Sequence, residues 1–466
     1  MTKQRLLAAV FGLTLMVSAP AFAPSAYAMD ERTLLEAVKD GDTAAVQALL
    51  TSKADPNVTL ADTSTVLAWA VAHQNPEIVR ALLAAGANPN AHDRNGMTPF
   101  LFACQGSDAG IVGMFIDAKA DVMAKRPDGI SALSYCARYS SPAILQRMIA
   151  GGATVENVDI NGQTPLMWAA ADGRVDNINV LLKAGANVNA ASKKGFTPLF
   201  FAIKSPSGDA PKALIAAGAN INQVAVDGTT ALMLAGYSKK FDLASDLVNR
   251  GADTKVWDQN GHMPLHVAAL NNQTEYARLL ISKGADPNGV TAPSKLDWQI
   301  EPNAGRRPPP RYVGLTPLLV AAENGQPEIM KMLVASGAKP NFRASDGTSV
   351  VLSASESGSL AALSYAIEID PDTTAATDAG VTPMHLVFYN PSIQSNIISK
   401  DMGQMVKLIA DKGYPVDAKT IAGKKPLDNN RTPPPEVRKI YDQVLIDYAP
   451  RLSEVMAASE KGGRRR

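Results

Sequence analysis

A serine and a lysine stand three residues apart in Ser336-Gly-Ala-Lys339, which is the S-x-x-K spacing of a known serine nucleophile motif. In an active site the serine of this motif begins a helix and has further partner motifs. Here the four residues fill a slot that is "KGAD" or "AGAN" elsewhere in the chain, and the partner motifs are absent. We therefore interpret the spacing as a coincidence in a helix-ending turn.

Other catalytic and metal-binding signatures are also missing from the sequence. It has no HExxH, no CxxC, no phosphate-binding glycine loop and no GxSxG. Five histidines and two cysteines leave little from which to build a metal site. We expect a protein that is not an enzyme, with no catalytic residue, no cofactor and no bound metal.

A strict internal period organises the chain. Glycines that precede "TP" or a variant of it recur every 33 residues, at Gly96, Gly129, Gly162, Gly195, Gly228 and Gly261. After an insertion of 20 residues the series continues at Gly314, Gly347 and Gly380, and after one of 10 residues it ends at Gly423. A second series of "AGAN", "RGAD" and "KGAD" segments keeps the same period. A fixed period of this length predicts an array of structural repeats.

Each unit predicts a pair of helices. In "DINGQTPLMWAAADGRVDNINVLLKAGANVNAA", Thr164 can cap a first helix and Pro165 suits its first position. A second helix is expected over 175–183, and Gly185 supplies the left-handed conformation that closes it. The core of this second helix is expected to be Val180, Leu181 and Leu182. Such a unit cannot bury its apolar face alone, so it must stack on its neighbours.

The "TPL" opening, the paired "AA", the "LL" and the "GA(N/D)xN" close resemble the ankyrin repeat. The resemblance covers about twelve units, counted by their period from Asp30 onwards. It implies an all-α solenoid of helix-turn-helix units joined by hairpin loops, with a concave face that binds other proteins. We assign residues 29–430 to this solenoid. The histidine of the family's "TPLH" remains only at His266 and His385, and the unit around Asp346 lacks the proline.

The two cysteines, Cys104 and Cys136, replace alanines of the "AA" pair in adjacent units. Stacked helices lie about 8–10 Å apart, farther than the Cα separation that a disulfide tolerates. A bridge would need a local distortion, and a free cysteine packs like a small apolar residue. We favour two buried thiols, with a disulfide as the alternative.

The N-terminus resembles a secretory signal. Lys3 and Arg5 precede an apolar run and two small-x-small sites, which end at Ala23 and Ala28. We expect residues 1–28 to be removed, with cleavage after Ala28 favoured over cleavage after Ala23. We expect a protein of the bacterial periplasm, with a eukaryotic secretory lumen as the alternative. An uncleaved anchor is the alternative, but the run is short for a bilayer. No later segment predicts a membrane span.

The formal net charge of +1 gives no electrostatic reason to expect nucleic acid as a partner. The resemblance instead implies a protein partner, bound by hairpin tips and by the ends of first helices, and we expect a monomeric chain. The matching positions are Arg94, Met97, Ile130, Tyr139, Asp172, Phe196, Tyr237, Trp257 and His262. Aromatic residues and arginine dominate interface energies, so Trp257, Phe196 and Tyr237 are favoured. Each of these aromatic residues could instead cover a neighbouring hairpin.

Two insertions interrupt the period. The longer one, near 291–312, replaces a hairpin tip on the edge where the family binds partners. Its candidate contact residues are Trp298, Arg306, Arg307, Arg311 and Tyr312. The arginines flank a stiff proline run and favour an acidic partner, although a tolerated surface loop is the alternative. The shorter insertion, 390–401, lengthens a turn inside one unit.

The chain end is expected to cap the array. Residues 431–459 predict amphipathic capping helices, which bury Val437, Ile440, Tyr441 and Leu445. Residues 460–466 are expected to form a disordered basic tail. The favoured function is a non-catalytic periplasmic scaffold for protein–protein interaction. A cell-wall or small-ligand binding protein is the alternative, and it would need a polar pocket lined with aromatic residues.

Overall fold

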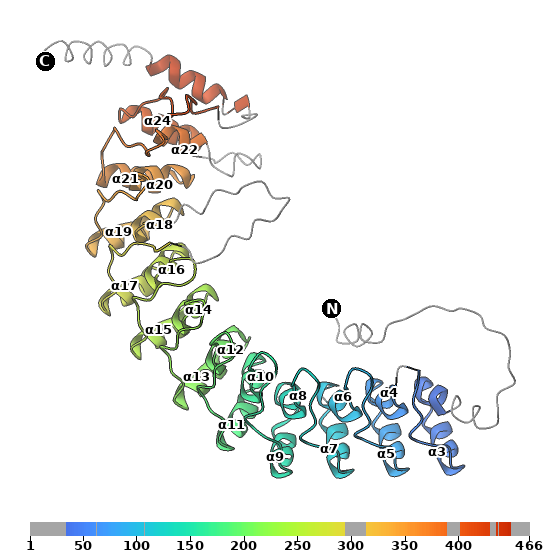
Figure 1. Cartoon of the computed structure of the whole chain (residues 1–466). Helices are drawn as coiled ribbons and strands as arrows, with labels where there is room; N and C mark the ends of the chain where they lie inside the picture. The colour runs from blue at the N-terminus through green and yellow to red at the C-terminus, as the bar shows by residue number, and fades with distance from the viewer. Residues whose placement is uncertain are drawn as a thin grey trace, which may run out of the picture. The chain divides into compact units, whose positions relative to one another are not determined.

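The structure is a computed structural model that describes residues 34–61, 63–106, 108–293, 314–388, 401–428, 435–436 and 438–448 (Figure 1). It divides into two units, unit 1 (Met1–Ala225) and unit 2 (Val226–Arg466). Both consist of short paired helices. The described residues form isolated bridges at Thr59–Thr65 and Lys125–Ser131 but no strand. The predicted all-α repeat architecture is confirmed.

Unit 1 arranges its helix pairs in two layers (Figure 1). The first helices pack on one another in chain order and are α4 (Val66–Ala72), α6 (Pro99–Gly106), α8 (Ala132–Tyr139), α10 (Pro165–Ala171) and α12 (Pro198–Lys204). The second helices form the other layer and are α3 (Thr43–Thr51), α5 (Pro76–Ala84), α7 (Ala109–Asp117), α9 (Pro142–Ala150), α11 (Val175–Lys183) and α13 (Asp209–Ala216).

Unit 2 repeats the arrangement. Its first helices are α14 (Ala231–Tyr237), α16 (Pro264–Leu270), α18 (Pro317–Glu323), α20 (Val350–Glu356) and α22 (Pro383–Phe388). Its second helices are α15 (Phe241–Asn249), α17 (Thr274–Ser282), α19 (Pro327–Ala335), α21 (Leu360–Ile369) and α24 (Met402–Asp411). Helix α16 packs directly on α18, so the longer insertion leaves the stack intact.

Hydroxyl caps start several of the first helices in both units, although α12 and α16 begin without such a bond. The Thr164 hydroxyl accepts a hydrogen bond from the Met167 amide at 3.4 Å, at the start of α10. Helix α20, whose unit lacks the proline, is capped in the same way by Ser349, which accepts from the Leu352 amide at 3.3 Å. The hydroxyl cap therefore suffices to begin a helix without proline at its first position.

The core of the second helices is narrower than the sequence suggested. In α11 the apolar residues that are fully buried are Ile178 and Leu181, whereas Val180 and Leu182 are half-buried. A helix packed on one side buries residues three or four apart, so three consecutive residues cannot all face the core. Gly185 follows with φ of +90°, as predicted for the residue that closes this helix.

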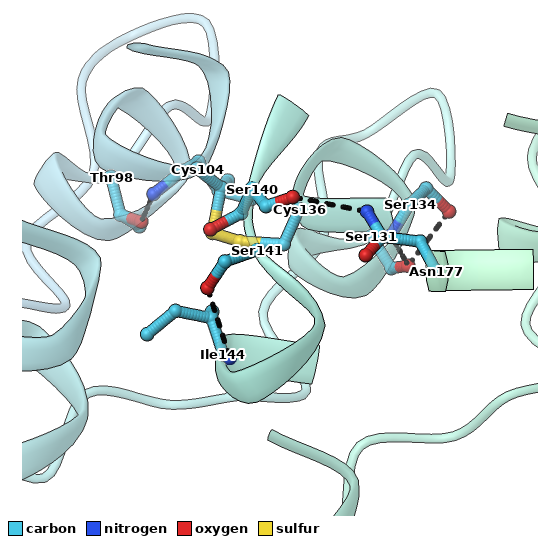
Figure 2. Close-up of a disulfide and its surroundings, with 10 residues drawn as sticks. Thr98, Cys104, Ser131, Ser134, Cys136, Ser140, Ser141, Ile144 and Asn177 are labelled. Atoms are coloured by element: carbon cyan, nitrogen blue, oxygen red, sulfur yellow. Dashed lines mark hydrogen bonds between the residues drawn. A yellow bond between two sulfur atoms is a disulfide. The ribbon is translucent and has the colours of Figure 1, made fainter. Parts of the chain in front are cut away.

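Cys104 and Cys136 form a disulfide between α6 and α8, which corrects the expectation of free thiols (Figure 2). Cys104 is the sixth residue of its helix and Cys136 the fifth of its own, so the two side chains are offset by one position. Small residues along this stripe let the helices come close, and the two Cα atoms are 4.8 Å apart. The general spacing of packed helices therefore overestimated this separation.

The chain end adds a helix over 438–448 that covers the last pair of unit 2. Tyr441 and Val444 are its buried residues, at 4% and 2% exposure. Ile440 and Leu445, which were expected in the core, are only half-buried, because Tyr441 and Val444 define the inward face. Val437 and residues 449–466, including the expected basic tail, lie outside the described residues. Within the described ranges no helix is both long and apolar enough to cross a membrane.

Candidate functional site

Consecutive hairpin tips are joined in register by their backbones. The Asp159 carboxylate accepts from the Asn161 amide at 2.8 Å and shapes its own tip. The Ile160 amide donates to the carbonyl of Asp128, one tip earlier, at 2.8 Å. The Lys193 amide donates to the carbonyl of Asn161 at 2.9 Å in the same manner. Residues that are 33 apart in the sequence therefore occupy equivalent places on neighbouring tips.

Three consecutive tips of unit 2 expose large apolar side chains. Trp257 is 46% exposed and stands between Val226, at 80%, and Val290, at 38%. The indole Nε1 of Trp257 donates to the Val290 carbonyl at 3.2 Å, which holds the ring against the following tip. On the other side, a Cβ placed on Gly228 would be 3.2 Å from the Trp257 carbonyl. The three tips are therefore in close contact.

Tyr237 connects these tips to the first-helix layer. It is the last residue of α14 and is 40% exposed. Its hydroxyl donates to the Asp258 carboxylate at 2.6 Å and lies 3.0 Å from Nδ1 of His262. Burial raises the pKa of Tyr237, and the adjacent Asp258 raises it further, so the phenol stays protonated. We name Val226, Tyr237, Trp257 and Val290 the Trp257 surface.

Two buried histidines support the Trp257 surface. Burial lowers the pKa of His262, and the Asp258 carboxylate opposes this shift. Burial lowers the pKa of His266 to about 4. The Nδ1 atom of His266 accepts from the Met263 amide at 3.2 Å, and Nε2 lies 3.0 Å from the Leu315 carbonyl. A neutral ring with its proton on Nε2 satisfies both contacts.

Comparison with known families identifies the repeat. Residues 34–126, 107–192, 133–225 and 199–291 match the family of ankyrin repeats in three copies, and residues 313–345 match the single ankyrin repeat. These matches cover more than half of the chain. The chain belongs to the ankyrin repeat family. No curated protein matched it.

An ankyrin repeat array is typically a non-catalytic scaffold for protein–protein interaction. The S-x-x-K pair is consistent with this class, because Ser336 lies at the C-terminal end of α19 and its hydroxyl contacts the Met332 sulfur at 3.6 Å. The described residues contain no group of histidines, cysteines and carboxylates that could hold a metal ion.

Four candidate residues occupy the slot just after the tip glycine of this ankyrin repeat protein. Met97 and His262 are 7% and 8% exposed, so little of either side chain is open to a partner. Ile130 and Phe196 are half-buried. The cause is local, because the amide of this slot bonds back to a side chain of its own tip, four positions earlier in His262 to Asp258 at 2.8 Å and two positions earlier in Ile130 to Asp128 at 3.2 Å. This bond turns the side chain towards the first helix.

The remaining candidates lie at the surface or outside the described residues. Arg94 is exposed and donates to the Ala61 carbonyl at 2.7 Å. Tyr139 is half-buried beneath Arg138, and exposed Asp172 lies 3.6 Å from the same arginine. The candidates in the longer insertion, which all lie outside the described residues, are Trp298, Arg306, Arg307, Arg311 and Tyr312.

The base of the longer insertion is well defined. The Thr291 amide donates to the Leu315 carbonyl at 2.9 Å, and the Thr291 hydroxyl accepts from the Leu315 amide at 3.0 Å. The Gly314 amide donates to the Thr291 carbonyl at 3.2 Å. Thr291 thus takes the place of a tip aspartate, and the described residues on either side of the insertion, Pro293 and Gly314, belong to the tip that follows Trp257.

Sequence reasoning missed Val226, Val290, Arg126 and Arg138. Val290 could have been found by aligning the units on Trp257, because it stands 33 residues after it, whereas Val226 stands 31 residues before Trp257 and is not in the same slot. Arg126 and Arg138 gave no such signal, since only the packing shows that Arg126 donates to the Tyr135 hydroxyl at 3.0 Å and that Arg138 lies over the Tyr139 and Trp168 rings.

Proposed function

We propose that this ankyrin repeat protein is a non-catalytic scaffold of the bacterial periplasm that binds a protein partner along its hairpin tips and the ends of its first helices. The apparent export signal and the disulfide support the compartment, because disulfides persist in oxidising environments. The observation that carries the binding proposal is the Trp257 surface, where Trp257 is 46% exposed on a tip between two tips with exposed valines, and Tyr237, 40% exposed, bonds to the same tip as Trp257 through Asp258.

The Trp257 surface has the composition of an interface anchor. Tryptophan and tyrosine are enriched at the centre of protein interfaces, and their rings add contact area at a low cost in conformational entropy. The ring of Trp257 is already fixed by its bond to Val290, and the hydroxyl of Tyr237 by Asp258. A partner would meet side chains that lose little freedom on binding.

The test is quantitative capture of partners from the periplasm by the mature protein and by Trp257→Ala. Truncation of an interface anchor costs about 2 kcal/mol or more, so we expect capture to fall about thirtyfold at equal thermal stability. The matched control is Ile421→Ala, another tip residue of unit 2, at 81% exposure. Equal capture by all three proteins would place binding elsewhere. Mass spectrometry of the exported protein tests cleavage after Ala28.

The alternative of a cell-wall or small-ligand binder lacks a supporting pocket among the described residues. The larger of two described cavities, about 320 Å³, lies beside the start of α11 and has no aromatic residue in its lining. Retention of the protein on isolated peptidoglycan, with no protein captured, would nevertheless favour this alternative over the scaffold.

A further inference from the structure

Unit 1 carries a row of aromatic residues on its first helices. The residue four positions after each helix cap is aromatic in five consecutive units, and these are Trp69, Phe102, Tyr135, Trp168 and Phe201. The helices that carry them pack side by side in chain order. Phe102 and Tyr135 are buried, whereas Trp69, Trp168 and Phe201 remain partly exposed. The rings of Tyr135 and Trp168 touch edge to face, with centroids 5.7 Å apart. We call these five residues the aromatic row.

Positively charged side chains of unit 1 contact the aromatic row. The Lys39 ammonium is 4.7 Å from the centre of the Trp69 ring. Arg126 donates to the Tyr135 hydroxyl at 3.0 Å. The guanidinium of Arg138 lies 5.8 Å from the Trp168 ring and 5.1 Å from the Tyr139 ring. Arginine stacked on aromatic rings is held in a fixed orientation while its outer N–H groups remain available.

Several N–H groups in the middle of the aromatic row lack a hydrogen-bond acceptor. Three N–H groups are buried and have no acceptor among the described residues, namely Nε of Arg126, Nε of Arg138 and Nε1 of Trp168. The nearest carboxylate to Arg138 belongs to Asp172 at 3.6 Å, which is longer than a hydrogen bond. Buried donors in folded proteins are normally satisfied, so this cluster of three is a candidate place for an acceptor from another molecule.

The charges around the cluster favour an anionic acceptor. The nearby tip carboxylates are engaged within the protein: Asp128 pairs with Arg126 at 3.1 Å, and Asp159 accepts from the amide of its own tip. Lys193 and Lys194 on the following tip are exposed. Asp172 is exposed and lies 3.6 Å from Arg138, so a partner carboxylate would take its place there, while Lys193 and Lys194 add positive charge on the following tip.

We propose that the aromatic row binds an aspartate or glutamate side chain carried by an extended apolar segment of a partner polypeptide. The carboxylate accepts from Arg138 and from the indole of Trp168, and the apolar residues beside it pack on the rings of the row. A charge-assisted bond next to an aromatic surface provides both orientation and affinity. This inference rests on the proposed scaffold function and adds the chemistry of the partner.

The test uses the mature protein labelled with ¹⁵N in its tryptophan side chains and two synthetic peptides, acetyl-Leu-Glu-Leu-Glu-Leu amide and its glutamine twin. The Trp168 indole signal is assigned by its loss in Trp168→Phe. We expect the glutamate peptide to shift this signal, and the glutamine twin to bind about tenfold more weakly, because it lacks the charge-assisted bond. Inorganic phosphate at the same concentration is expected to leave the signal in place.

Arg138→Gln is the decisive variant, with Arg80→Gln as the matched control on an exposed face of α5. We expect Arg138→Gln to lose the peptide response at unchanged thermal stability, Arg138→Lys to retain part of it, and Arg80→Gln to retain all of it. Equal binding of the two peptides, or an undiminished response in Arg138→Gln, would overturn the inference. A full response to phosphate would also overturn it, in favour of a small-anion site.

The result can be separated from the scaffold proposal. Trp257→Ala alters unit 2 only, so it is expected to bind the glutamate peptide as the parent protein does. If no peptide binds while Trp257-dependent capture persists, the carboxylate site is wrong and the scaffold stands. If the peptide binds but no partner is captured, the scaffold proposal is the one that fails.

Discussion

The two units use the same helix frame to present different chemistry. In unit 1 the fourth residue after each first-helix cap is aromatic, as in Tyr135 and Trp168. In unit 2 the same slot holds Leu234, Val267, Val320, Ser353 and Leu386. Exposed aromatic residues of unit 2 are found instead at a tip and at the end of α14, in Trp257 and Tyr237. The repeat therefore fixes the position of this side chain in the fold, whereas the residue type at that position differs between the units and can suit different partners.

The two units also differ in the interactions that link adjacent repeats: a disulfide in unit 1 and buried histidine side chains in unit 2. Unit 1 has a covalent link between adjacent first helices, through Cys104 and Cys136. Unit 2 has His266 and His385, both fully buried, whose rings bond to the Leu315 and Lys424 carbonyls of the next tip. Among its described residues unit 1 buries no histidine. Oxidation state and acidity should therefore act on different parts of the protein.

The largest effect is expected from removing an equivalent core leucine in each unit. Leu181 in α11 and Leu247 in α15 are both fully buried and occupy the same repeat slot. Leu181→Ala and Leu247→Ala should each lower the free energy of unfolding by about 2–5 kcal/mol through the cavity left behind. Hydrogen exchange resolved by mass spectrometry locates the loss. We expect it in the altered unit alone, whereas equal loss of protection in both would show one cooperative array.

Loss of the disulfide should weaken unit 1 selectively. Replacing both Cys104 and Cys136 by alanine removes a link across 32 residues, which is expected to cost about 2–4 kcal/mol. The measurement is denaturant unfolding with and without reductant. Reductant should reproduce the effect in the parent protein and change nothing in the double variant. An identical midpoint for all four samples would contradict a stabilising role.

Acid should weaken unit 2 selectively. The pKa of His266 is about 4 in the folded protein and about 6.5 when unfolded, so the unfolded chain binds the proton first. The contribution of this neutral ring is complete above pH 6.5 and is lost as the pH falls towards 4, by an amount on the order of 3 kcal/mol.

The acid effect is tested with His266→Met, because Met233 fills the same slot one unit earlier. The variant leaves the Met263 amide and the Leu315 carbonyl without this partner, so it should be less stable at pH 7. Its stability should nevertheless depend less on pH between 6.5 and 4 than that of the parent. Parallel curves for the two proteins would show that His266 does not carry the dependence.

The sequence was sufficient for the fold because every unit restates the same local rules. Thr164 at a cap and Gly185 at a helix end behave as their residue types predict. The exposure of the candidate site residues was less predictable from the sequence. The side chain after the tip glycine is buried because its backbone amide donates to the side chain of an earlier tip residue. Met97 and His262 were therefore expected at the surface, and the Cys104–Cys136 link was missed because its helices approach more closely than average.

The smallest effect on stability is expected from deleting residues 294–313. The deletion joins Thr291-Ala-Pro293 directly to Gly314, which restores both the 33-residue step from Gly261 and a regular tip. Thr291 is kept because its hydroxyl accepts from the Leu315 amide. Loop length contributes little to folding, so the free energy of unfolding should change by less than about 1 kcal/mol. Thermal and denaturant unfolding measure this.

The same deletion tests whether the irregular tip of unit 2 adds to recognition. It removes Arg306, Arg307 and Arg311, which the sequence inserts into the tip that follows Trp257. We expect partner capture to fall at low salt and to differ less from the parent at high salt, because charge contacts at a surface are screened. Capture that is equal to the parent at both salt concentrations would reduce the segment to a tolerated insertion. The four side chains of the Trp257 surface would then account for binding in unit 2 on a tip as regular as those of unit 1.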